Sequence, residues 1–165
     1  MSGSTAAKDV RSVLVRGARE EARLDGSSTI EAEHVLLALA ALEGTATARL
    51  LAAAGLNRDG VRAVLDREWE QSLAVAGVRI DAGQLPTATP DPTRTPRIGE
   101  STVRLLQRAM DASSELGGGR ITATHMLVGV LDTKLGRVSR ALDLAGVDRA
   151  ALRALAAESA QRGER

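Results

Sequence analysis

The sequence contains no cysteine, phenylalanine or tyrosine, and Trp69 is its only aromatic residue among 165. Without cysteine there can be no disulfide and no thiolate metal site. Apolar residues make up 44% of the sequence, and nearly all of them are alanine, leucine or valine, which must build the core. Because alanine and leucine are the strongest helix formers, the composition predicts an all-α fold.

Neither charge is in excess, because the sequence contains 22 lysines and arginines and 21 aspartates and glutamates, which gives a net charge of +1. That balance provides no electrostatic footprint for nucleic acid or an anionic membrane. No apolar run reaches the roughly 18 residues of a membrane span, and the N-terminus lacks a signal-peptide core. We therefore expect a cytoplasmic protein with no nucleic-acid partner and no membrane partner.

The sequence is a tandem duplication. His34 in TIEAEHVLLALAAL pairs with His125 in ITATHMLVGVL, and the offset between them stays constant along the chain without a gap. The same offset pairs Leu14 with Leu105, Ala18 with Ala109, Gly26 with Gly117, Ile30 with Ile121, Leu51 with Leu142, Gly55 with Gly146 and Arg62 with Arg153. A repeat of this kind predicts that one structural unit occurs twice.

Each copy predicts four short helices. The first spans about 8–24 and 100–116, the third about 45–54 and 136–145, and the fourth about 58–73 and 148–161. The second helix is apolar nearly all round, which predicts a buried central position. Expected N-caps are Thr29 or Ser28, Thr122, Asn57 and Asp148, while Gly55 and Gly146 are expected structural stops.

The expected organisation is one domain over 1–165, with repeat 1 at 6–76, a connector at 77–98 and repeat 2 at 99–160. All four prolines lie in the connector, at Pro86, Pro90, Pro92 and Pro96. Proline lacks the backbone N–H that a helix interior needs, so the connector cannot be one continuous helix.

The repeated pattern is a helix ending in glycine, then I-x-x-x-H-x-L-L-x-L, then a short helix closed by A-G-L or A-G-V. It resembles the Clp N-terminal domain family, the double-repeat helical module of the Clp unfoldase ATPases. The ClpC type is the most similar, through EEAR at 20–23, EAEHVLLALA at 31–40 and ARLLAAAGL at 48–56. In the second copy MDAS at 110–113 and ATHMLVGVL at 123–131 keep the same spacing.

The resemblance implies two four-helix repeats related by pseudo-twofold symmetry, packed through their central helices into one compact domain. It also implies a non-catalytic module without a cofactor, which docks Clp components, adaptors or substrate segments. ClpC-type members also bind cyclic-peptide antibiotics and, in some cases, phosphorylated arginine. No G-x-x-x-x-G-K-[ST] stretch is present, so this chain cannot cradle a nucleotide as an unfoldase does.

Two interpretations of the chain follow from the resemblance. It is either a stand-alone accessory protein that lacks the AAA+ ATPase modules and modulates proteolysis or sequesters ligands, or the excised N-terminal domain of a ClpC-type unfoldase. A DNA-associated helical regulator is a further alternative, because short helices joined by glycine turns can mimic a helix-turn-helix.

The resemblance also places a binding groove where the copies meet. The family's guanidinium-binding glutamate corresponds to Glu33 in the first copy and to Thr124 in the second. Threonines at the start of each first helix correspond to Lys8 and Gly99. Because a hydroxyl cannot supply the charge that a guanidinium requires, phosphoarginine recognition is disfavoured and restricted to the first copy. Without phenylalanines, docking is expected to use aliphatic residues such as Val10, Val13 and Leu85, or the many arginines.

The paired histidines suggest catalysis, but no H-E-x-x-H or similar motif surrounds them, and no metal site is expected. We therefore interpret His34 and His125 as structural groups that hydrogen-bond the start of each central helix. Trp69 is expected to cover the junction with the connector or, alternatively, to be an exposed anchor for a partner.

Overall fold

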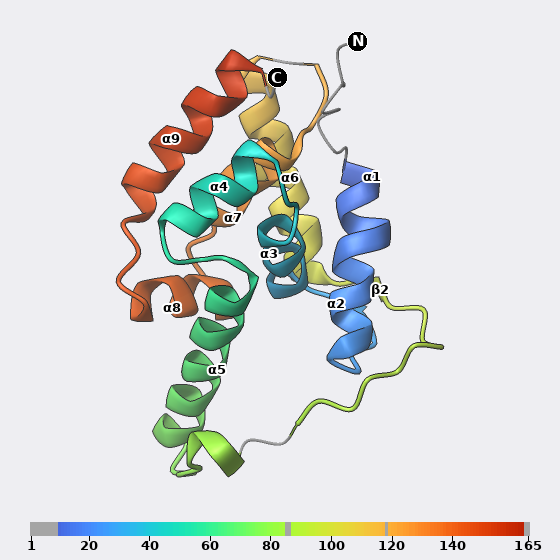
Figure 1. Cartoon of the computed structure of the whole chain (residues 1–165), viewed down its shortest axis with the longest axis vertical. Coiled ribbons are helices and arrows are strands. Elements are labelled where there is room, and N and C mark those ends of the chain that lie inside the picture. Colours follow the sequence, from blue (N-terminus) through green and yellow to red (C-terminus); the bar gives the residue numbers. More distant parts are fainter. Residues whose placement is uncertain (1–9, 85–86, 118, 164–165) are drawn as a thin grey trace.

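Leucine and alanine at helical spacing form helices in both halves of the chain, which confirms the predicted all-α class with two tandem four-helix repeats (Figure 1). The computed structural model describes residues 10–84, 87–117 and 119–163. Lys8 and Leu85 of the predicted groove lie outside the described residues. The bounds expected for the repeats, 6–76 and 99–160, stay predictions.

The helices follow the order expected from the duplication, and two short strands that were not predicted accompany them. In the first half they are α1 (Val10–Ser12), the π-helical segment η1 (Val13–Ala18), α2 (Arg19–Leu24), β1 (Thr29–Ile30), α3 (Ala32–Ala40), α4 (Ala46–Ala53) and α5 (Arg58–Val75). The first three form one continuous helix. After the 3-10 turn η2 (Ala82–Gln84), the second half contains β2 (Arg97–Ile98), α6 (Glu100–Leu116), α7 (Ala123–Leu131), α8 (Arg137–Leu144) and α9 (Arg149–Arg162).

Helix starts follow the predicted caps except at α3. The side chains of Thr122, Asn57 and Asp148 accept backbone N–H groups at the starts of α7, α5 and α9, as predicted. The prediction of Thr29 or Ser28 for α3 is wrong, because the N-cap is Glu31. Thr29 and Ile30 form β1 instead, and the Ser28 carbonyl before them accepts the N–H of Arg97 at 3.0 Å.

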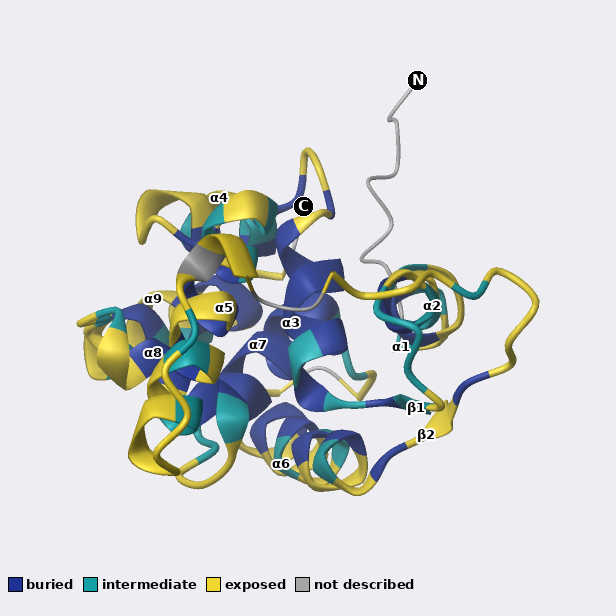
Figure 2. Cartoon of the chain, turned by 90° about the horizontal axis from the view of Figure 1, so that it is seen from below, coloured by how far each residue is buried: buried dark blue, intermediate teal, exposed yellow. Residues whose placement is uncertain are grey.

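The two apolar central helices form the core, with the other helices around them (Figure 2). All residues of α7 are buried, and all of α3 except Glu33. At the ends of α4 and α8, Gly55 and Gly146 adopt positive φ values of 75° and 68°, which favour glycine. They let the chain turn, so that the N–H of Leu56 reaches the carbonyl of Leu51 at 2.8 Å.

A two-residue parallel pair of strands joins the repeats, with Thr29 opposite Arg97 and Ile30 opposite Ile98. The Ile30 carbonyl accepts the N–H of Gly99 at 2.9 Å and the hydroxyl of Thr102 at 2.7 Å. This pairing brings the start of α6 beside the start of α3. The connector reaches it along the end of α2, where the N–H of Asp91 donates to the carbonyl of Arg23 at 2.9 Å.

Each repeat packs its first helix tightly against its second through a glycine, but the glycine lies on different helices. In the first repeat Gly17 of η1 faces α3, and a Cβ atom there would lie 2.8 Å from Ala38 Cβ. In the second repeat Gly129 of α7 faces α6, and a Cβ atom would lie 2.7 Å from the Leu105 carbonyl oxygen. Both contacts require the absence of a side chain.

The substitution Gly129→Ala tests this packing. Helix propensity alone would stabilise the protein by about 1 kcal/mol, whereas the backbone clash in a filled core lowers the free energy of unfolding by about 1–3 kcal/mol. We expect the clash to dominate in urea unfolding. The control is Gly83→Ala, whose Cβ meets nothing within 4 Å; a stabilised Gly129→Ala protein would contradict the close approach.

Candidate binding site

The starts of the two central helices are fixed by the paired histidines. His34 Nδ1 accepts the backbone N–H of Glu31 at 2.9 Å, and His125 Nδ1 accepts that of Thr122 at 3.1 Å. A nitrogen that accepts an N–H carries no proton, so each neutral ring has its hydrogen on Nε2. The duplicated histidines thus satisfy one backbone donor at each buried helix start.

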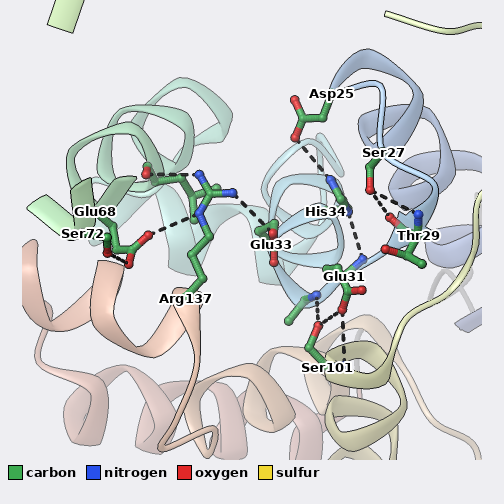
Figure 3. Close-up of polar contacts among 12 residues, drawn as sticks. Asp25, Ser27, Thr29, Glu31, Glu33, His34, Glu68, Ser72, Ser101 and Arg137 are labelled. Atoms are coloured by element: carbon green, nitrogen blue, oxygen red, sulfur yellow. Dashed lines mark hydrogen bonds and ion pairs between the residues drawn. The ribbon is translucent and has the colours of Figure 1, made fainter. Parts of the chain in front are cut away.

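The second ring nitrogen distinguishes the copies. His34 Nε2 lies 3.2 Å from Asp25 Oδ2 (Figure 3). Asp25 Oδ1 also accepts a hydrogen bond from Arg62 Nη1 at 2.9 Å. The residue in the second copy that corresponds to Asp25 is Leu116. His125 Nε2 is accordingly buried, with no hydrogen-bond partner among the residues that the structure describes.

These environments set the direction of the pKa shifts. Burial alone raises the pKa of Asp25, but hydrogen bonds from His34 and Arg62 outweigh it, so the pKa lies below its usual value. Burial lowers the pKa of His125, because a charged imidazolium would be desolvated there. Neither histidine has a nitrogen available to a substrate, so neither can act as a general base in this conformation.

Several residues of the predicted groove lie inside the protein, which corrects the expected docking surface. Val13 and Thr124 are fully buried, because Val13 faces the core and the Thr124 hydroxyl lies 3.2 Å from that of Thr47. Gly99 is buried against the Glu31 carboxylate. Val10 is half-buried against the core. These four positions therefore do not form a continuous exposed aliphatic surface.

The starts of α3 and α6 are tied together by Glu31 and Ser101. The Ser101 hydroxyl donates to the Glu31 carboxylate and accepts the N–H of Ala32 at 2.8 Å. The Ser101 N–H also donates to Glu31 Oε2 at 3.3 Å. The meeting point of the copies is thus closed by hydrogen bonds within the chain (Figure 3).

Glu33 is present where expected but already holds a guanidinium group. Its carboxylate accepts Arg137 Nη1 at 3.4 Å, and its side chain is 14% exposed. Arg137 also donates to the Leu65 carbonyl at 3.3 Å and lies 3.3 Å from the Glu68 carboxylate. An arginine-like ligand would have to displace Arg137 before it could bind Glu33.

Glu68 lies at the centre of this ionic cluster between α5 and α8. It accepts Arg140 Nε at 2.8 Å and the Ser72 hydroxyl at 2.7 Å, and it is nearly fully buried. Burial raises the pKa of Glu68, but the hydrogen bonds from Ser72 and Arg140 outweigh it and lower the pKa overall. Glu68 is therefore an ionised anchor for α8, and sequence reasoning did not identify it.

Trp69, which follows Glu68 on α5, is 45% exposed, and its ring lies beneath the guanidinium of Arg137, with Cζ 5.9 Å from the ring centroid. It borders a pocket of about 780 Å³ between α5, the end of α2, the start of α8 and the connector. We call this cavity the connector pocket; its polar lining comes from Asp25, Arg58, Arg62, Asp66 and Arg137. Connector residues Thr87 and Pro90 line its other side.

The signal that could have located the cluster is a difference between the copies. Glu68, Trp69 and Arg137 correspond to Ser159, Ala160 and Ala46 in the other repeat. Of these three departures from the repeat, Trp69 and Arg137 line the connector pocket, and Glu68 forms an ion pair with Arg137.

The fold defines a class of protein, the all-α module of two repeated four-helix units. The chain belongs to the family described as the Clp repeat (R) N-terminal domain, whose family model matches residues 8–117. It is thus a domain related to the Clp system. No curated protein matches the chain.

Several solved structures are similar to the chain. One is the N-terminal domain of the caseinolytic protease associated chaperone ClpD from Arabidopsis thaliana, with 20% identity, a TM-score of 0.58, and coverage of 90% of this chain and 94% of that one. Another comes from preliminary structural investigations of a malarial protein secretion system, with 15% identity, a TM-score of 0.61, and coverage of 92% and 93%. Identities this low establish the fold alone.

Among residues 10–84, 87–117 and 119–163, no helix is long and apolar enough to cross a membrane. The same residues contain no group of three or more His, Asp or Glu side chains placed to hold a metal ion.

Replacing Asp25 by leucine, the residue at the corresponding position of the second copy, tests the role of the Asp25 carboxylate. The change removes the acceptor of His34 and a partner of Arg62, so we expect the free energy of unfolding to fall by about 1–3 kcal/mol in urea. Asp111→Leu, at an exposed position of α6, should change it by less than about 0.5 kcal/mol. Equal effects of the two substitutions would contradict the assigned contact.

The lowered pKa of His125 predicts a loss of stability in mild acid. Above the ordinary value of 6.5 both the folded and the unfolded state are neutral at this residue. Below it the unfolded state binds a proton that the folded state does not, so stability falls by up to about 1.4 kcal/mol per pH unit. Urea unfolding at about pH 7.5 and 5.5 should show this slope, and His125→Gln should flatten it; stability that rises in acid would disprove it.

Proposed function

We propose that the chain is a non-catalytic accessory protein of the Clp protease system in the cytoplasm. It docks adaptors, substrate segments or peptide ligands, including cyclic peptides, as ClpC N-terminal domains do, and thereby modulates proteolysis or sequesters these ligands. Membership of the Clp repeat N-terminal domain family supports the connection to this system.

The observation that carries docking is the connector pocket with Trp69 at its border. A half-exposed tryptophan in a cavity bordered by arginines is typical of the residues that dominate protein interfaces. The pocket is built from both repeats and the connector, because α8 supplies Arg137, the end of α2 and α5 supply most of the lining, and the connector supplies Thr87, Ala88 and Pro90. Both nitrogens of His34 are hydrogen-bonded, and His125 has one hydrogen-bonded and one buried nitrogen, which favours binding over catalysis.

The site differs from the groove that the family resemblance implies. Glu33 is engaged by Arg137, and Thr124 is buried. Phosphoarginine recognition through these two positions is therefore disfavoured, and docking through the connector pocket takes its place in the proposal.

Capture of partners from a lysate of the host organism tests the proposal. We expect the immobilised chain to retain Clp subunits, adaptors or proteolysis substrates, and Trp69→Ala to reduce their recovery at least about tenfold, as for a hot-spot residue worth about 2 kcal/mol. The matched control is Leu155→Ala on α9, because Leu155 is 49% exposed, close to the 45% of Trp69. If Leu155→Ala and Trp69→Ala reduce the recovery of partners equally, the pocket is not the docking site. If the immobilised chain recovers no Clp component, adaptor or substrate, the proposed function is wrong.

A further inference from the structure

Two arginines of the connector pocket, Arg58 and Arg62, share a carboxylate partner, Glu21, that lies outside the lining of the cavity. Glu21 is almost fully buried, and its carboxylate accepts hydrogen bonds from Arg58 Nε at 2.7 Å and Arg58 Nη2 at 2.9 Å. It also receives Arg62 Nη2 at 3.4 Å. Glu21 does not line the pocket, whereas the side chains of Arg58 and Arg62, which are 39% and 30% exposed, do.

The pocket consequently presents donors whose hydrogens remain unused. Arg58 Nη1 and Arg62 Nε make no hydrogen bond to any residue in the described part of the chain. Of the lining carboxylates, Asp25 is occupied by Arg62 and His34, which leaves only the exposed Asp66 without an ion pair among those residues. Guanidinium donors of this kind match a carboxylate, which can accept two parallel hydrogen bonds.

An apolar platform lies beside these donors. Trp69 and Leu24 are both partly exposed, and both line the cavity together with Pro90 of the connector. They provide area for an aliphatic side chain next to the charged group. A cavity of about 780 Å³ accommodates a few residues of an extended peptide.

From this geometry we propose that the connector pocket binds an acidic peptide segment of a partner protein, in which an aspartate or glutamate has an aliphatic neighbour. The carboxylate pairs with Arg58 and Arg62, and the aliphatic side chain contacts Trp69 and Leu24. The proposal rests on the docking function above and specifies the chemistry of the segment that docks.

The chain contains its own reporter for the experiment, because Trp69 is its only tryptophan and no tyrosine or phenylalanine is present. The probes are three blocked peptides, N-acetyl-Ala-Leu-Glu-Leu-Ala-amide and its analogues with glutamine or lysine in place of glutamate. We expect the glutamate peptide to change the Trp69 emission and to bind at least about tenfold more tightly than the lysine peptide. Added salt should reduce that difference.

Two substitutions change the pocket charge in opposite directions. Arg58→Gln should weaken binding of the glutamate peptide about tenfold, since it removes a charged hydrogen bond. Because this change also leaves Glu21 without a partner and can impair folding, Asp66→Asn provides a second test at an exposed position. Removing the opposing carboxylate should tighten binding about threefold. Glu43→Gln makes the same charge change outside the pocket and should have no effect.

The proposal is overturned if the lysine peptide binds as well as the glutamate peptide, if Asp66→Asn weakens binding, or if none of the peptides changes Trp69 emission at millimolar concentration. If the peptide experiment fails but capture of Clp components still depends on Trp69, the docking function stands and only the preference for acidic segments is rejected. Specific binding of the glutamate peptide without such capture would keep the site and reject the assignment to the Clp system.

Discussion

The structure depends on the burial of two almost entirely apolar helices, α3 and α7, at its centre. A helix start in a dry interior leaves backbone N–H groups without water, and each must find an acceptor. His34 and His125 supply one acceptor each through Nδ1, at equivalent places. This structural role explains why a histidine occurs at the same position in each copy.

Duplication and divergence contribute differently to the molecule. The positions that the copies share, such as Leu51 with Leu142 and Gly55 with Gly146, lie in the core or at helix ends. Of the charged residues that line the connector pocket, Arg58 and Arg62 recur in the second copy as Arg149 and Arg153. Asp25, Asp66 and Arg137 instead have the uncharged counterparts Leu116, Ala157 and Ala46. A largely symmetric core therefore supports a surface that differs between the copies.

Much of the fold could be predicted from the sequence, because helical periodicity and caps act locally. The predicted caps Asn57, Thr122 and Asp148 each lie one residue before the first residue of a helix. The predicted start of α3 is wrong because it depends on a partner far along the chain. Thr29 and Ile30 pair with β2 and therefore do not join the helix. The site was predicted less well. Burial of Val13 and Thr124, and the neutralisation of Glu33 by Arg137, depend on tertiary packing that no local pattern reveals.

The pairing of β1 with β2 also constrains how the chain can fold during synthesis. The Ile30 carbonyl and the N–H of Ala32 find their partners on Gly99, Ser101 and Thr102, far along the chain. The start of α3 in a nascent first repeat therefore lacks these acceptors and donors until residues 99–102, about seventy positions beyond Ile30, have also emerged, and closing so long a loop is slow. The first repeat, although it resembles an independent unit, cannot complete the start of its central helix before the second repeat has begun.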